Sequence, residues 1–231
     1  MRPRLVWLRS SATEVSAWLQ NRPIGRILTL MTKGEATRTM VLERAATLFN
    51  QKGYFATSLS DIMSATGLEK GGIYNHFANK DALALAAFDF VVQRMRLAFA
   101  AVIRSQHNAA ERIKSIVAIF TTIPQGFPVP GGCPVMNTAI ESDNAHPALR
   151  DKARAVMREW QTFIRKVIAT GVRSGELPGS LDPEQLASFL IAALEGAVML
   201  SSLYDDPAHM DRTADHLRRY IDELALTARR S

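Results

Sequence analysis

The segment KGGIYNH, residues 70–76, carries hydrogen-bonding and charged groups on a stretch with little side-chain bulk. Lys70 supplies an ammonium group, and Asn75 supplies an amide that both donates and accepts hydrogen bonds. Tyr74 and His76 add two aromatic rings with polar tips. These groups are suited to binding phosphate oxygens and the polar edges of nucleotide bases, which is recognition rather than bond breaking.

The two adjacent glycines of this segment are costly, because each destabilises a helix interior by roughly 1 kcal/mol relative to alanine. On a helical wheel Ile73 and Phe77 fall together and form a packing seam, while Gly71, Gly72 and Asn75 lie opposite. Tyr74 and His76 flank this bare face, so a large partner could approach the helix backbone closely.

The surrounding elements predict a helix-turn-helix. Ser58 and Asp61 have the spacing of a capping box, and Gly67 can form the tight turn that separates this helix from the segment above. The second helix would then enter the major groove of DNA, which is just wide enough to admit it. Lys80, on the next helix, would reach a phosphate.

The stretch TSLSDIMSATGLEKGGIYNHFANKDAL, residues 57–83, resembles the DNA-binding module of the tetracycline-repressor (TetR) family. The resemblance extends from about Thr37 to Arg96. It implies a homodimeric, all-helical transcriptional regulator that binds a pseudo-palindromic operator in double-stranded DNA and is released by a small molecule. By position it assigns base contacts to Lys70, Gly72 and Asn75, and backbone contacts to Ser60, Tyr74, His76 and Lys80. Gly71 is expected to belong to the same DNA-binding surface.

Two departures from the family pattern bear on specificity. Glu69 places an anion near the phosphates, where members of the family often have Ser or Thr. Gly71 and Gly72 stand where side chains often read bases, so specificity would depend on fewer contacts or on DNA shape.

Caps and hydrophobic periodicity predict an all-α protein with about nine helices and no strand. We expect a basic leader (1–34), a helix-turn-helix domain (35–96) and a helical ligand-binding and dimerisation domain (97–231). The leader is expected to be disordered or to lie upstream of a natural start at Met31, and its arginine content leaves a mitochondrial presequence open. The helices are expected at about 38–52, 58–67, 70–77, 80–105, 108–124, 134–142, 147–175, 183–204 and 207–227.

Charge by itself says little about DNA binding. The net charge is +6, but the leader alone contributes +5, and residues 97–231 hold equal numbers of acids and bases. The single cysteine excludes an internal disulfide and fits a cytoplasmic protein. No apolar run approaches the roughly 18 residues of a membrane span, so no membrane partner is expected.

The last two predicted helices carry more apolar residues than one buried stripe needs, and the family resemblance implies that they meet a second copy in a four-helix bundle. The alternative is that they only cover the monomer core. The resemblance also implies an effector pocket between the middle helices. Its candidate lining and sensing residues are Phe120, Met136, Trp160, Phe163 and Cys133, and core packing explains most of these equally well.

Few charged residues mark that region, which favours an apolar or reactive effector. Gly132-Cys133-Pro134 would put the thiol at a helix N-terminus, where N–H groups can stabilise a thiolate. The segment also resembles, more loosely, a subgroup in which a Gly-Cys accompanies electrophile sensing. A buried, inert thiol is the competing interpretation.

An enzyme is the chief rival class. His209 and His216 are seven residues apart, whereas metal sites on helices usually use a spacing of three or four. No phosphate-binding loop, nucleophile elbow or paired-cysteine motif occurs in the sequence, so no enzyme, cofactor or metal is expected. A second alternative is a helical ligand-binding or interaction module that does not bind DNA.

Overall fold

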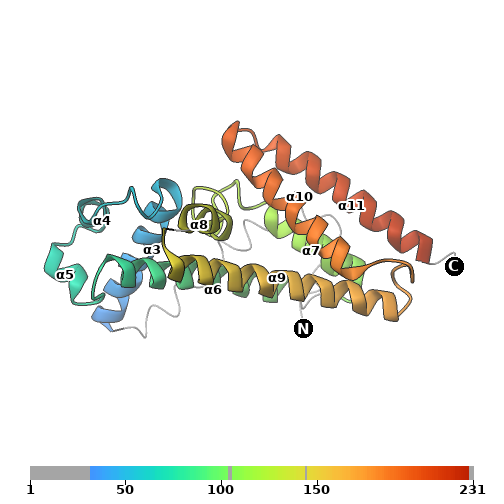
Figure 1. Cartoon of the computed structure of the whole chain (residues 1–231), viewed down its shortest axis with the longest axis horizontal. Coiled ribbons are helices and arrows are strands. Elements are labelled where there is room, and N and C mark those ends of the chain that lie inside the picture. The colour runs from blue at the N-terminus through green and yellow to red at the C-terminus, as the bar shows by residue number, and fades with distance from the viewer. Residues whose placement is uncertain (1–31, 104–105, 144, 229–231) are drawn as a thin grey trace, which may run out of the picture.

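A computed structural model describes residues 32–103, 106–143 and 145–228. Within these ranges the chain forms nine helices and no strand, which confirms the all-α prediction (Figure 1). The predicted leader lies outside the described residues except for its last three positions. The helices are α3 (Lys33–Lys52), α4 (Leu59–Thr66), α5 (Lys70–Tyr74), α6 (Lys80–Ile103), α7 (Ala109–Phe120), α8 (Pro134–Ser142), α9 (Pro147–Arg173), α10 (Pro183–Leu203) and α11 (Ala208–Ala228).

Several predicted helix boundaries coincide with local caps. Ser58 and Asp61 form the capping box of α4, in which each backbone N–H donates to the other side chain. Gly67 ends α4 in the left-handed conformation, with φ 68°. Asn108 and Asp182 cap α7 and α10 as expected.

Three boundaries differ from the prediction by three residues or more, and one of them is the end of α7, at Phe120 rather than near Pro124. Helix α3 begins at Lys33 rather than near Arg38, because Thr32 and Glu35 form a capping box. Helix α5 ends at Tyr74 rather than at Phe77. The N–H of His76 donates to the carbonyl of Ile73, a three-residue bond that tightens the chain out of the α-helix.

The long helices α6 and α9 lie side by side and run in the same direction (Figure 1). Lys152 on α9 pairs with Asp89 on α6 at 2.7 Å, and further along both helices Arg96 pairs with Glu159. The first halves of both helices lie close to α3 and α8, and the second halves lie beside α7 and α10. One pair of helices therefore extends from the helix-turn-helix module into the body.

Helices α10 and α11 pack on each other at the far end of the molecule from α5 (Figure 1). Helix α10 is long and apolar enough to cross a membrane by length and composition, with a mean hydropathy of 1.8 over its best window, although the sequence analysis found no apolar run of that length. Its buried side, which includes Leu186, Leu190, Leu194 and Val198, belongs to the protein core. Core packing thus accounts for much of its apolar character.

Candidate functional site: nucleic-acid interface and ligand cavity

The seam predicted for α5 is buried. Ile73 is 1% exposed and Phe77 is 5% exposed, and both belong to the core shared with α3 and α4. The guanidinium of Arg38 lies over the ring of Phe77, 5.0 Å from its centroid. These contacts hold the buried side of α5 against the core, and the opposite side of the helix faces away from it.

That outward side is bare, as the glycines predict. Gly71 is exposed, and a Cβ built there would meet no atom within 4 Å. A Cβ at Gly72 would make only ordinary contacts with Leu68. Neither glycine has a positive φ. Nothing within the described chain therefore requires glycine at these positions, and the two glycines leave the helix backbone accessible from outside.

The polar candidates surround this bare face. Ser60, Lys70, Tyr74 and Asn75 are exposed, whereas His76 and Lys80 are half-buried. The Lys70 ammonium lies 5.7 Å from the centre of the Tyr74 ring. Asn75 is the C-cap residue of α5, and its side chain forms no hydrogen bond within the described chain. Seven of the eight predicted DNA-contact residues therefore lie on α5, directly after it or at the start of α6, and Ser60 lies at the start of α4.

Glu69 is the N-cap residue of α5, and its side chain caps no backbone N–H. It is exposed beside Lys70. Ser and Thr at this position would supply a capping oxygen without a charge. Glu69 therefore leaves the N-terminus of α5 without a side-chain cap, and it would repel a phosphate brought close to this terminus.

A cavity of about 470 Å³ lies among α6, α7, α9 and α10. Three of the residues predicted for an effector pocket line it: Phe120, Trp160 and Phe163. Met136 and Cys133 do not, because α8 lies away from this cavity. Phe99, Arg96, Arg112 and Glu159 also line it, although the sequence did not predict them as pocket residues. Phe99 could have been predicted, because it is an aromatic residue at helical spacing. Nothing in the sequence pattern indicates that the three charged residues line a cavity.

Comparison with known proteins agrees with this arrangement. Residues 41–87 match the model of bacterial regulatory proteins of the tetR family, and residues 109–217 match a tetracyclin repressor-like C-terminal domain. A TetR transcriptional regulator from Chloroflexus aurantiacus is 44% identical, with a TM-score of 0.79 over 83% of this chain and 97% of that one. The repressor ComR of Escherichia coli is 30% identical over 69% of this chain and 76% of its own length.

The chain belongs to the TetR family of transcriptional regulators. It is accordingly a DNA-binding regulator of the repressor type and not an enzyme. The fold also matches a CifR cysteine mutant in complex with a 26-base-pair operator, at 21% identity and a TM-score of 0.71, covering 78% of this chain and 94% of that one.

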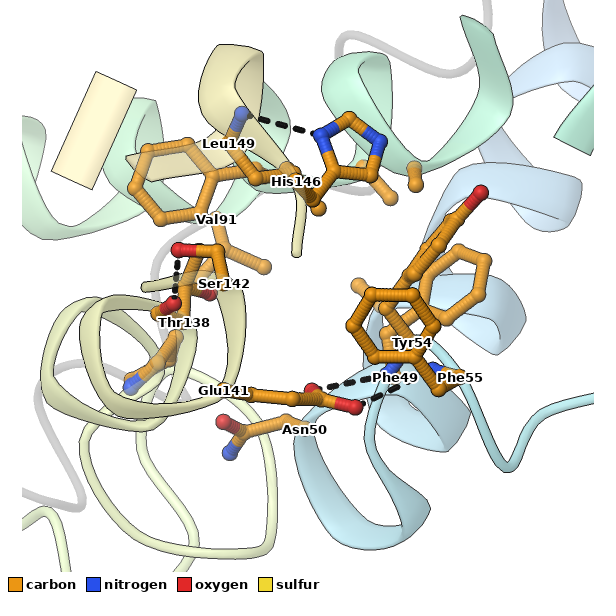
Figure 2. Close-up of a pocket in the computed structure, with 15 residues that line it drawn as sticks. Phe49, Asn50, Tyr54, Phe55, Val91, Thr138, Glu141, Ser142, His146 and Leu149 are labelled. Atoms are coloured by element: carbon orange, nitrogen blue, oxygen red, sulfur yellow. Dashed lines mark hydrogen bonds between the residues drawn. The ribbon is translucent and has the colours of Figure 1, made fainter. Parts of the chain in front are cut away.

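In this TetR-family chain a carboxylate links the body to the DNA-binding module. Glu141 on α8 accepts hydrogen bonds from the backbone N–H groups of Tyr54 at 2.8 Å and Phe55 at 3.0 Å, in the segment that follows α3 (Figure 2). Gly53 makes room for it, since a Cβ there would collide with the carboxylate. The hollow beside this joint is only about 40 Å³, too small for an effector.

The same joint reaches the start of α6. The Tyr54 hydroxyl donates to Asp81, and the Tyr54 ring lies edge-on to His146 at 4.8 Å between centroids. Burial and then the bond to Asp81 raise the pKa of Tyr54 to about 12. The Lys80 ammonium lies 4.4 Å from the centre of the same ring. Contacts thus connect the body to a residue at the DNA-facing end.

Cys133 is the N-cap residue of α8, and Pro134 follows at the first helical position, as predicted. The thiol is fully buried, and its sulfur lies 3.1 Å from Oε1 of Glu195 on α10. Burial, followed by the charge of Glu195, raises the pKa of Cys133 well above its usual range, and the helix N–H groups only partly oppose this. The thiol is therefore protonated and shielded, which favours the packing interpretation.

Proposed function

We propose that the protein is a homodimeric repressor that binds a pseudo-palindromic operator through α5 and dissociates from it when an effector occupies the 470 Å³ cavity. In this proposal the helix-turn-helix domain comprises residues 35–96 and the ligand-binding and dimerisation domain residues 97–231. Lys70, Gly71, Gly72 and Asn75 face base edges, and Ser60, Tyr74, His76 and Lys80 face phosphates.

The observation that carries the DNA assignment is the bare, outward side of α5. Its seam is buried, Gly71 is exposed and Gly72 is half-buried, and its polar groups surround them. A helix of this shape can place its backbone close to base edges in the major groove. The Asn75 amide can donate to the N7 atom of adenine and accept from its N6 amino group at the same time.

Support for the homodimer comes from apolar side chains left exposed on α10 and α11. Phe189, Met199 and Leu203 on α10 are 48%, 48% and 69% exposed, and Leu226 on α11 is 51% exposed. Large exposed apolar side chains on two adjacent helices favour an interaction surface there. A twofold axis there would place two α5 helices on one face of a duplex.

The assembly test uses two similarly exposed leucines. Leu203→Glu should shift the protein from dimer to monomer in sedimentation velocity, because a charge would be buried in the interface. Leu97→Glu is the matched control, since Leu97 is 62% exposed on α6. Equal behaviour of both variants would place the interface elsewhere.

The function test begins with selection of bound fragments from the source genome, which yields the operator and its symmetry. Asn75→Ala should then weaken binding to the selected operator by about 1–3 kcal/mol and relax preference at one position of each half-site. Its binding to random duplex should change little, and Thr170→Ala on α9 serves as the control. Equal loss on both duplexes would remove Asn75 from base reading.

Failure to retain any duplex in a salt-dependent manner would favour the alternative of a helical module without DNA binding.

A further inference from the structure

The cavity in the body has a lining with two distinct parts, one aromatic and one charged. Phe99, Phe120 and Trp160 form the aromatic part, with centroid separations of 6.3 Å, 6.0 Å and 5.9 Å. The rings are tilted or edge-on to one another, at angles between 45° and 79°. Such a cluster offers ring faces and edges to a planar guest, which aromatic rings contact favourably.

The charged part contains Arg96, Arg112 and Glu159. Arg96 and Glu159 satisfy each other, with Nε of Arg96 donating to Oε1 of Glu159 at 3.0 Å and a second bond beside it. The hydrogen bond that Arg96 donates to Glu159 contributes most to raising the pKa of Arg96. This pair leaves no net charge on that side of the cavity.

Arg112 differs from Arg96, because no carboxylate in the described part of the chain pairs with it. Its Nε donates to the backbone carbonyl of Gln106 at 3.3 Å, a bond that holds the guanidinium near the α6–α7 connection. The terminal nitrogens make no hydrogen bond within the described residues. The cavity lining therefore carries one uncompensated positive charge.

We propose that the cavity takes a planar aromatic organic anion, with its ring system among Phe99, Phe120 and Trp160 and its carboxylate on Arg112. The class of ligand rests on the proposed function, in which this cavity is the effector site. A guanidinium group can donate two parallel, charge-assisted hydrogen bonds to a carboxylate, which a single neutral oxygen cannot accept. A cationic ligand would meet the uncompensated charge of Arg112, and a neutral one would leave it unpaired.

The chemical prediction differs from the one made from sequence, which expected an apolar or reactive effector because few charged residues marked the region. Arg96, Arg112 and Glu159 come from three different helices, and only the fold brings them to one cavity.

The test measures binding of three matched probes to the full chain by calorimetry, without DNA. Naphthoate should bind about ten- to a hundredfold more tightly than naphthylmethanol, the range expected for a charged hydrogen-bonded pair. Naphthylmethylammonium should bind more weakly than either. Arg112→Gln should abolish the preference for naphthoate and leave the affinity for naphthylmethanol within about twofold.

Arg154→Gln is the matched control, because Arg154 is exposed on α9 and pairs with Asp151 away from the cavity. Circular dichroism and thermal unfolding establish that both variants are folded. Three outcomes would overturn the inference: equal affinity for the three probes, a naphthoate preference that survives in Arg112→Gln, or no binding of any probe.

A separate measurement of operator release distinguishes this inference from the proposed function. Selective naphthoate binding without operator release would uphold the ligand class and refute the effector role of the cavity. Operator release that is equal for the anionic and neutral probes would uphold the effector role of the cavity and refute the ligand class.

Discussion

Glu141 accepts the backbone N–H of Tyr54 at 2.8 Å, across 87 positions of sequence, and so joins α8 to the α3–α4 connection of the DNA-binding module. A glutamine at position 141 could accept one N–H but would present its own amide hydrogens to the other. We expect Glu141→Gln to lower the free energy of unfolding by about 1 kcal/mol and to reduce the change in operator affinity caused by effector.

Amide hydrogen exchange gives the direct readout, since the N–H groups of Tyr54 and Phe55 should lose protection in Glu141→Gln. The exposed Glu223 on α11 provides a control as Glu223→Gln. Unchanged protection of these N–H groups would mean that the Glu141 contact does not couple α8 to the DNA-binding module.

Lys80 should act on all DNA sequences alike, because an ammonium contacts phosphate without reading a base. Lys80→Ala should weaken operator and random duplex equally and reduce the salt dependence of binding by about one ion per protomer. The control is Lys166→Ala on the exposed side of α9. A change in sequence preference would show that Lys80 does more than neutralise charge.

Glu69→Ser should tighten DNA binding. The change removes an anion beside the phosphates and supplies an N-cap oxygen that Glu69 does not provide. Affinity for operator and random duplex should rise together, measured by fluorescence anisotropy at fixed salt. Loss of affinity confined to the operator would contradict this expectation and identify Glu69 as an acceptor for a cytosine amino group.

The buried Glu195 predicts a pH-dependent stability. Burial raises its pKa from 4.5 to about 7, although the bond from Cys133 opposes this. Between these values the folded state holds a proton that the unfolded state releases, so the free energy of unfolding falls as pH rises from 4.5 to 7 and levels off above 7. The loss is roughly 3 kcal/mol at most.

Glu195→Gln should remove this slope. Denaturant unfolding at pH 5, 6, 7 and 8, at one protein concentration, compares the two proteins. Parallel pH profiles would mean that Glu195 does not change its protonation in this range.

Cys133 should react slowly with N-ethylmaleimide in the folded protein and rapidly after unfolding, because the thiol is buried and its pKa is raised. Cys133→Ser should then respond to electrophiles as the parent does. Fast alkylation of the folded protein, with operator release that Cys133→Ser abolishes, would instead support thiol sensing. Mass spectrometry of timed reactions measures both rates.

The sequence determined the DNA-binding module almost completely, because its signals are local. A capping box at Ser58 and Asp61, a left-handed turn at Gly67 and a seam of Ile73 and Phe77 each act within a turn or two of helix. The early start of α3 was also readable, since Thr32 and Glu35 have the spacing of a capping box. The end of α5 is set by the three-residue hydrogen bond from His76 to Ile73, which the hydrophobic pattern does not show, so the pattern alone placed it three residues too late.

Only the tertiary structure decided which side chains of the C-terminal helices meet and which of them line the cavity. Arg96 meets Glu159 across 63 positions, and Cys133 meets Glu195 across 62. Such pairs depend on the packing of α6, α8, α9 and α10, which periodicity does not specify, because an amphipathic stripe says that a helix is covered but not by which neighbour. The same reason explains why the charged lining of the cavity and the Glu141 joint were invisible in the sequence.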